Sequence, residues 1–237
     1  MHACRFLCLA VSRRDGGNCI AGIDIDTGKW IRPVNSKTHG ALGDHEIVVR
    51  DGGTQKLRIL TPLDVLQIAL DKYAGDHAQP ENWELVPPSN AEQYTVLRRF
   101  DRREDQDELT SYLEQSGPLL HSYKDSVPVS DIAARKLTTS LALIRPEKLH
   151  WKVSPKSKYP KELQIRAEFL FDHDSYSLVL TDPIWETKCR RYGQGRHSHL
   201  AIAGDANERV LLTISLAGVP LYGYHYKLAA GVVQLPG

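Results

Sequence analysis

A tryptophan stands between two cations near the start of the chain, at Lys29, Trp30 and Arg32. An indole can stack on a nucleic-acid base while a neighbouring cation neutralises the phosphate, so these residue types in this order favour nucleic-acid binding. The alternative is that Trp30 belongs to the core and Arg32 is a solvated strand residue. We therefore predict the three residues as contacts to nucleic acid and keep the structural explanation open.

A second basic pair precedes two glycines. Arg13 and Arg14 come before Gly16 and Gly17. Backbone N–H groups of glycines can approach an anion closely, so this turn is a candidate phosphate contact. A plain solvated turn explains the same residues equally well.

The best candidate for a polyanion site is a third basic group beside a glycine-rich stretch. Its members are Lys188, Arg190, Arg191 and Arg196. Most of them fall near the end of a predicted helix over 182–193, where cations also complement the helix dipole. A lysine-rich loop over 152–161 adds Tyr159 as a second stacking candidate, although such loops are usually just solvated.

Histidines and acids near the same stretch make a weaker case for catalysis. The group comprises Cys189, His197, His199, Asp205 and Glu208. Its spacing matches no standard zinc motif, and the chain contains neither a phosphate-binding loop motif nor H-E-x-x-H. We expect no catalytic residue, metal or cofactor, and a small metal-dependent hydrolase is the least favoured alternative.

Composition limits the kind of binding that these residues can support. The 237 residues include 41% hydrophobic and 25% charged residues with a formal net charge of +1, so a polyanion must bind at a local patch. The four cysteines show no C-x-x-C pair, and no apolar run reaches the roughly 18 residues of a membrane span. We expect a cytoplasmic protein with reduced thiols and no membrane contact.

The elements that must position Trp30 and Arg32 are two strands of a hairpin over 18–34. Cys19, Ala21, Ile23 and Ile25 alternate as one apolar face. A three-residue loop, Asp26-Thr27-Gly28, would then pair Asp24 with Trp30 and Gly22 with Arg32. In this register Gly22 leaves room for a flat ligand between the indole and the guanidinium, and Pro33 ends the ladder.

The rest of the chain is mainly strand, with a charged helical piece in the middle. Leu163 to Phe171 alternates cleanly and places Gln164, Arg166 and Glu168 outward, and Tyr222, Tyr224 and Tyr226 are expected in the core. We predict a mainly β protein of two OB-like β-barrels joined by a short helical connector. The predicted boundaries are 1–90, 91–136 and 137–237.

Motifs at both ends of the chain resemble the bacterial dual OB-domain family. The N-terminal motifs are Ser12-Arg13-Arg14, Cys19 to Asp24 and Gly28 to Val34, and the C-terminal ones are Thr181-Asp182-Pro183, Trp185-Glu186 and Tyr226-Lys227-Leu228. The resemblance implies two OB-type barrels that bind nucleic acid, often near defence or DNA-modification systems. It implies no catalytic residues.

Together these patterns predict a non-enzymatic protein that binds nucleic acid, with single strands favoured. It would act as an accessory or sensor subunit of a bacterial defence or nucleic-acid-processing system, with other subunits as possible partners. Because OB-like barrels also bind peptides, a protein-interaction adaptor is the main alternative.

Overall fold

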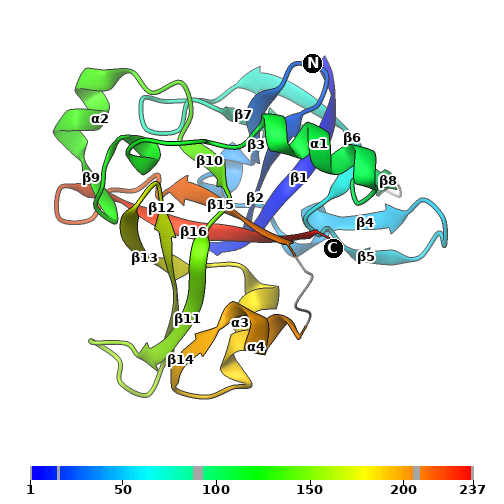
Figure 1. The fold of residues 1–237 in the computed structure, drawn as a ribbon. Coiled ribbons are helices and arrows are strands. Elements are labelled where there is room, and N and C mark those ends of the chain that lie inside the picture. Colours follow the sequence, from blue (N-terminus) through cyan, green and yellow to red (C-terminus); the bar gives the residue numbers. More distant parts are fainter. Residues whose placement is uncertain (1, 15–16, 88–92, 205–208, 236–237) are drawn as a thin grey trace. The chain divides into compact units, whose positions relative to one another are not determined.

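The computed structural model describes residues 2–14, 17–87, 93–204 and 209–235, and only the backbone of Arg14 (Figure 1). The chain divides into two compact units, Met1–Tyr112 with Leu137–Thr139 and Leu113–Lys136 with Ser140–Gly237. Residues 91–136, expected to form a connector, are thus divided between the units after Tyr112. The fold is mainly β, as predicted.

The first unit contains a closed five-stranded barrel. Its ring runs β1–β2–β3–β7–β6 and returns to β1, with β3 and β7 parallel, and β8, β4 and β5 continue outward from β6. The strands are β1 (His2–Arg14), β2 (Gly17–Asp24), β3 (Lys29–Val34), β4 (Val48–Asp51), β5 (Leu57–Ile59), β6 (Asp64–Tyr73), β7 (Asn82–Leu85) and β8 (Tyr94–Arg99). The helical elements are η1 (Ser36–Thr38), η2 (Asp44–Ile47) and α1 (Arg103–Ser111).

Strand β1 closes the barrel because it pairs along both of its edges. Its first half, from His2 to Leu7, pairs with β6, and its second half pairs with β2 from Phe6 onward. The register shifts between Cys8 and Ala10, which is a bulge that lets one strand bend between two neighbours. Phe6, Cys8 and Val11 face the main core of this unit.

Gly22 provides the close approach that this curvature needs. A Cβ built there would lie 2.0 Å from the carbonyl oxygen of Leu7 and 2.8 Å from a ring carbon of Phe6. The space beside Gly22 is therefore already filled by β1. The expectation that a flat ligand could approach at Gly22 is wrong.

The predicted hairpin forms, but its register is shifted by one residue. The loop contains four residues, 25–28, so that Ile23 pairs with Trp30 and Gly22 with Ile31. The Thr27 hydroxyl donates to the Asp24 carboxylate at 2.8 Å, and Gly28 N donates to the Asp24 carbonyl at 2.8 Å. A shift of one residue turns every side chain of β3 to the other face.

A fully buried carboxylate joins the barrel to its outer strands. Asp64 is 0% exposed and accepts hydrogen bonds from Arg58 Nη1 at 2.6 Å, Arg58 Nη2 at 2.8 Å and Arg99 Nη1 at 2.9 Å. The two guanidinium groups come from β5 and β8. Such a fully bonded buried charge fixes the geometry, because losing either partner would leave a charge unpaired.

The second unit is built on one continuous path of strands. Its order is β10–β15–β16–β13–β12–β11–β14, with β13 and β16 parallel and β9 added to β16. The strands are β9 (Ser126–Pro128), β10 (Leu141–Ile144), β11 (Glu147–Pro155), β12 (Leu163–Phe171), β13 (Asp174–Leu180), β14 (Gly195–Ser198), β15 (Arg209–Leu216) and β16 (Tyr224–Leu235). The helical elements are η3 (Leu119–His121), α2 (Val129–Arg135), α3 (Pro183–Arg190) and α4 (His199–Ala203).

The order in which strands pair in the second unit corresponds to the order in the first barrel. Strand β10 pairs with β15 and β11 pairs with β12, and only Arg145 and Pro146 separate β10 from β11. The two strands together therefore take the part of β1, interrupted where proline cannot donate a ladder hydrogen bond. The first part of this interrupted strand, β10, pairs with β15, and the second part, β11, pairs with β12.

Helix α3 was predicted well. Asp182 caps it by accepting from Ile184 N at 2.9 Å and Trp185 N at 3.0 Å, and Trp185 and Cys189 are buried. The glycine-rich stretch after it contains strand β14, and helix α4 follows; both pack beside β11 (Figure 1).

The prediction that Tyr222 and Tyr224 belong to the core is wrong, and Tyr226 is partly buried. Tyr222 is 74% exposed and Tyr224 is 43% exposed, whereas His225 and Lys227 point inward at 2% and 1%. The prediction assumed that alternate residues from Tyr226 to Val232 all face the same side of the strand. In β16, however, Gly231 pairs with Thr213 and Ala229 with Ile214, so that Ala230 is an extra residue. This bulge reverses the side on which residues beyond it lie.

Replacing Gly22 by alanine tests the close approach of β1 and β2. We expect Gly22→Ala to lower the free energy of unfolding by about 2 kcal/mol or more, since backbone atoms cannot move aside. Gly53→Ala is the matched control, because its new Cβ would meet only Asp51 Oδ1 at 3.6 Å. Equal stability of the two variants in urea unfolding would contradict the tight packing.

Candidate nucleic-acid interface

Arg32 is a structural residue of the first barrel. Its Nη2 lies 3.0 Å from Glu81 Oε1, both side chains are less than 5% exposed, and its backbone N donates to the Glu81 carbonyl at 2.9 Å. The expectation that Arg32 lies open beside Gly22 is wrong. The buried ion pair leaves this guanidinium unable to reach a phosphate without losing its partner.

The other predicted residues of the first unit are not brought together. Arg13 is exposed and pairs with Asn18 at the start of β2, whereas Lys29 is exposed and pairs with Asp24 at its end. Trp30 is partly buried. The side chain of Arg14 lies outside the described residues. Among the described residues of the first unit, the predicted cations Arg13 and Lys29 therefore lie beside opposite ends of β2 and are not gathered at one place.

Three cations line up across the second unit, on its outer face. Cross-strand pairing places Arg166 of β12 opposite Lys152 of β11, and Lys152 opposite Arg196 of β14. We call these residues the cation row. Their side chains are 25%, 51% and 56% exposed, respectively. Trp151, Val153 and Ile165 point inward from the same strands, as the alternation of β12 predicted.

Neighbouring polar groups orient the cation row. Glu168 lies 2.7 Å from Arg196 Nε and 3.9 Å from Lys152 Nζ, and Arg166 Nε donates to Ser177 Oγ at 3.0 Å. Arg166 also pairs with Asp125 at 3.3 Å. The side chains are thus held in place, and one carboxylate competes with any bound phosphate.

The predicted cations of α3 have different surroundings. Lys188 Nζ lies 4.4 Å from the Trp185 ring centroid and donates to Gln234 Oε1 at 3.0 Å. Arg190 pairs with Glu186 at 3.9 Å and donates to the Leu163 carbonyl at 3.2 Å. Arg191 is exposed at the helix end. Of the four residues predicted together, only Arg196 belongs to the cation row.

Sequence reasoning missed how Lys152 and Arg166 combine with Arg196. Lys152 was assigned to a loop, but it lies within β11. The outward direction of Arg166 was readable from the alternation of β12. Their alignment was not, because the three residues lie far apart in sequence and meet only through strand pairing.

His199 belongs to a stack of aromatic rings. It accepts a hydrogen bond from Trp151 Nε1 at 3.3 Å, and its ring lies 5.1 Å from that of Trp185 at an interplanar angle of 23°. Burial, with a smaller contribution from Lys188, lowers the pKa of His199 to about 4. The described residues contain no group of three or more His, Cys, Asp and Glu suited to a metal, and Asp205 and Glu208 lie outside them.

Two loops meet at one end of the second barrel. Lys158, in the loop between β11 and β12, donates from Nζ to the hydroxyl of Tyr222, in the loop between β15 and β16, at 3.2 Å. Its ammonium also lies 5.9 Å from the Tyr222 ring centroid. Tyr159 beside it is 62% exposed, so cations and aromatic rings occur here together.

A family model for the dual OB-containing domain matches residues 4–232. The chain belongs to this family. The match spans both barrels, so the second ring with its interrupted strand is an OB barrel like the first. No curated protein and no solved structure matches the chain.

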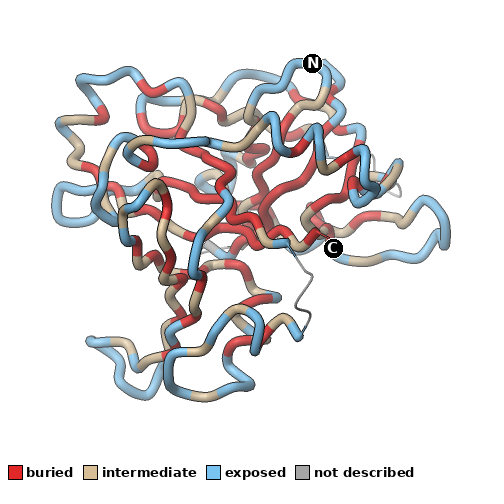
Figure 2. The backbone as a smooth tube through the Cα atoms, in the orientation of Figure 1, coloured by how far each residue is buried: buried red, intermediate tan, exposed pale blue. Residues whose placement is uncertain are grey.

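OB barrels bind oligonucleotides on the face of strands two and three and in the loops that join strands one to two and four to five. In the second barrel these are β12, β13 and the loops over 156–162 and 217–223. Arg166 of the cation row lies on β12, and Lys152 and Arg196 continue the row away from β13, through β11 to β14. In the first barrel the corresponding strands, β2 and β3, are buried over most of their length (Figure 2). Among the described residues, outward-facing side chains alternate along β12 and β13, so the second barrel is the more open of the two at this position.

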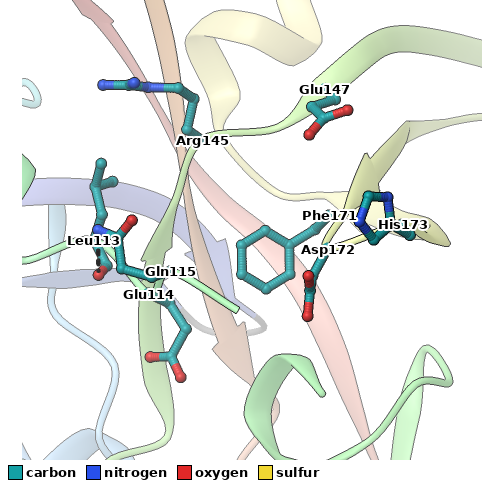
Figure 3. A pocket seen from close by; sticks show the side chains of 8 residues that line it. All are labelled: Leu113, Glu114, Gln115, Arg145, Glu147, Phe171, Asp172 and His173. Carbon is teal, nitrogen blue, oxygen red and sulfur yellow. Dashed lines mark hydrogen bonds between the residues drawn. The ribbon is translucent and has the colours of Figure 1, made fainter. Parts of the chain in front are cut away.

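A cavity of about 180 Å³ lies at the other end of the β11–β12 hairpin (Figure 3). Phe171, Arg145 and His173 line it together with three acids, Glu114, Glu147 and Asp172. The excess of carboxylates makes this cavity unsuited to a phosphate.

None of the helices in the described residues is long and apolar enough to cross a membrane.

The stacked His199 should make stability depend on pH. Its pKa of about 4 in the folded chain lies below 6.5, so the unfolded chain binds the extra proton between these values. The contribution of neutral His199 to the free energy of unfolding is complete above pH 6.5 and is lost as the pH falls to about 4. We expect the free energy of unfolding to fall by about 2 kcal/mol over this window.

Urea unfolding between these two pH values measures the effect. His199→Gln should flatten the dependence, whereas the exposed His77→Gln should leave it unchanged. A His199→Gln profile as steep as that of the parent protein would show that His199 does not titrate in this way.

Proposed function

We propose that this chain is a non-enzymatic nucleic-acid-binding protein of the cytoplasm, with single-stranded DNA or RNA as its favoured ligand. It would serve as an accessory or sensor subunit of a bacterial defence or nucleic-acid-processing system, together with other protein subunits. The observation that carries this proposal is the cation row, which runs from Arg166 on β12, the second strand of this OB barrel, through Lys152 on β11 to Arg196 on β14.

The chemistry around the cation row suits a sugar–phosphate backbone. Neighbouring strands lie about 4.8 Å apart, so the row spreads three positive charges over about 10 Å. Ser154, Gln164 and Ser177 surround it with neutral hydrogen-bonding groups. Residues 148–196 contain ten Lys and Arg against six Asp and Glu, which supplies a local positive field in a chain of nearly zero net charge.

Removal of the row should weaken binding and reduce its salt dependence. Triple replacement of Lys152, Arg166 and Arg196 by Gln removes three phosphate contacts, so the slope of log K against log salt should fall by about 2 for a single strand. Fluorescence anisotropy with a labelled single-stranded oligonucleotide at two or more salt concentrations measures both quantities.

A matched control removes three cations from the first unit, by replacing Arg13, Lys29 and Lys72 with Gln. This variant should bind almost as tightly as the parent protein. Loss of binding in the control with retention in the row variant would move the site to the first barrel. No binding by the parent protein at low salt would eliminate the proposal.

Glu168 should act as an internal competitor for Lys152 and Arg196. Its carboxylate pairs with both cations, so a phosphate must displace it or share them. We expect Glu168→Gln to tighten binding by about fivefold, because the amide keeps the size of the side chain without its charge. The same anisotropy assay applies, and unchanged or weaker binding would contradict direct phosphate contact at this position.

A further inference from the structure

The sheet of the first unit ends in a strand with one open side. Strand β5 stands last in the strand order, and within the described part of the chain it pairs only with β4 (Figure 1). We call the open side of Leu57–Ile59 the β5 edge. The edge of a sheet presents N–H and C=O groups that can pair with a further strand.

The register of β4 and β5 shows which peptide groups face this edge. Asp51 N donates to the Lys56 carbonyl at 2.9 Å. Ladder bonds of an antiparallel pair use every second residue, so Arg58 also bonds toward β4, and the N–H and C=O groups of Leu57 and Ile59 point the other way. The Ile59 carbonyl accepts one bond from Arg58 Nη1 at 3.2 Å and keeps a second lone pair for a partner.

Aliphatic side chains accompany these open peptide groups. Leu57 is 55% and Ile59 is 46% exposed, whereas Arg58 between them shares the inner face with the buried Val49. Sheet edges are commonly protected by charged residues, by proline or by a covering segment. Here both residues with open backbone groups are aliphatic, so the β5 edge has the features of a strand that binds another strand.

Strand β5 is held in its extended conformation by side-chain bonds. Arg58 Nη1 donates to Asp64 Oδ2 at 2.6 Å and Arg58 Nε to Asp51 Oδ2 at 3.4 Å. Asp51 Oδ1 also accepts from Thr54 N at 2.8 Å and Thr54 Oγ1 at 3.0 Å, which fixes the turn before β5. A strand that is already ordered loses little conformational entropy when it pairs.

The β5 edge is complementary to a second copy of itself. When Arg58 lies opposite the partner's Arg58, Leu57 lies opposite the partner's Ile59, and Ile59 opposite the partner's Leu57. Each of these two pairs joins residues with open backbone groups, so each pair exchanges two hydrogen bonds. The aliphatic side chains of each pair then meet on the outer face of the joined sheet.

Charge does not oppose this arrangement. The two Arg58 side chains meet near the symmetry axis, but each is already paired with the carboxylates of Asp64 and Asp51 of its own chain. Lys56 lies opposite the partner's Leu60 and so meets no like charge. A second copy therefore supplies aliphatic residues, open peptide groups and neutralised arginines together in one register.

We propose that the β5 edge binds a second copy of this chain, by antiparallel pairing of the two β5 strands around a two-fold axis at Arg58. Both copies use the same edge, so the assembly closes as a dimer and does not grow into a filament. Three residues per strand bury less surface than a standard interface, so the dimer should dissociate readily on dilution. The inference does not depend on the proposed function.

Sedimentation equilibrium of the full chain over a range of concentrations measures the dimer. The mass of the parent protein should rise from one chain toward two. The double variant Leu57→Lys with Ile59→Lys should stay at one chain, because each lysine would lie opposite another. Leu97→Lys with Tyr73→Lys is the matched control, since these side chains are 54% and 55% exposed on other strands, and it should dimerise like the parent protein.

A charge-swapped variant tests the register. Leu57→Glu with Ile59→Glu should also stay at one chain when alone. An equimolar mixture of the lysine and glutamate variants should form a heterodimer, because each lysine then faces a glutamate. Circular dichroism and a melting temperature close to that of the parent protein check that both variants fold.

Ile59→Pro tests the backbone pairing separately. The Ile59 N–H lies outside the β4–β5 ladder, so proline removes a donor of the β5 edge and retains an apolar side chain. We expect a folded variant that no longer dimerises. This variant also decides the question if either charged variant fails to fold.

Three results would overturn the inference. The first is a parent protein that stays at one chain at its highest soluble concentration, which would leave the β5 edge to a strand of a different protein. The second is a lysine variant or a folded Ile59→Pro variant that dimerises as readily as the control. The third is a parent protein that dimerises while the two folded charged variants fail to associate with each other, which would exclude this register.

Discussion

Each barrel depends on one stretch of backbone that hydrogen-bonds along both edges. In the first barrel this is β1, and in the second it is β10 followed by β11. The double pairing brings the strands around a common interior, which their inward side chains fill. It also explains why Gly22 lies against Leu7, and why binding has to take place on the outside of a barrel.

The two barrels share this scheme but differ in what their ligand faces offer. In the first, β2 and β3 are mostly buried and Arg32 is bound to Glu81. In the second, β11 and β12 alternate between apolar residues inside and polar residues outside. One fold thus supports a barrel that contains a buried ion pair and a barrel with an aligned set of charges on its outer face.

The fold class could be predicted because alternation is a local signal. The segment Leu163 to Phe171 shows it without interruption, and Asp182-Pro183 marks the start of α3 in the same way. Register could not be predicted as safely. The hairpin loop has one residue more than predicted and is stabilised by the Asp24–Thr27 hydrogen bond. This residue turns both Trp30 and Arg32 to the face opposite the predicted one. The bulge opposite Thr213 likewise could not be read from the sequence of β16.

The candidate site was harder to predict than the fold, for a related reason. Sequence reasoning grouped Lys188, Arg190, Arg191 and Arg196 because they are neighbours along the chain. The structure groups Arg196 with Lys152 and Arg166, which are neighbours only through strand pairing. Charge clusters on sheets run across strands, so they are invisible until the order and register of the strands are known.

Lys227 links the attachment of β9 to proton concentration. Burial lowers the pKa of Lys227 from its ordinary value of 10.5 to about 7, against an opposing contribution from Asp125. Between these values the unfolded chain carries a proton that the folded chain has released, so this lysine adds most to stability in alkaline solution and progressively less as the pH falls toward 7. The ammonium that holds the carbonyls of Ser122 and Lys124, just before β9, is therefore bound more weakly to its proton than an exposed lysine would be.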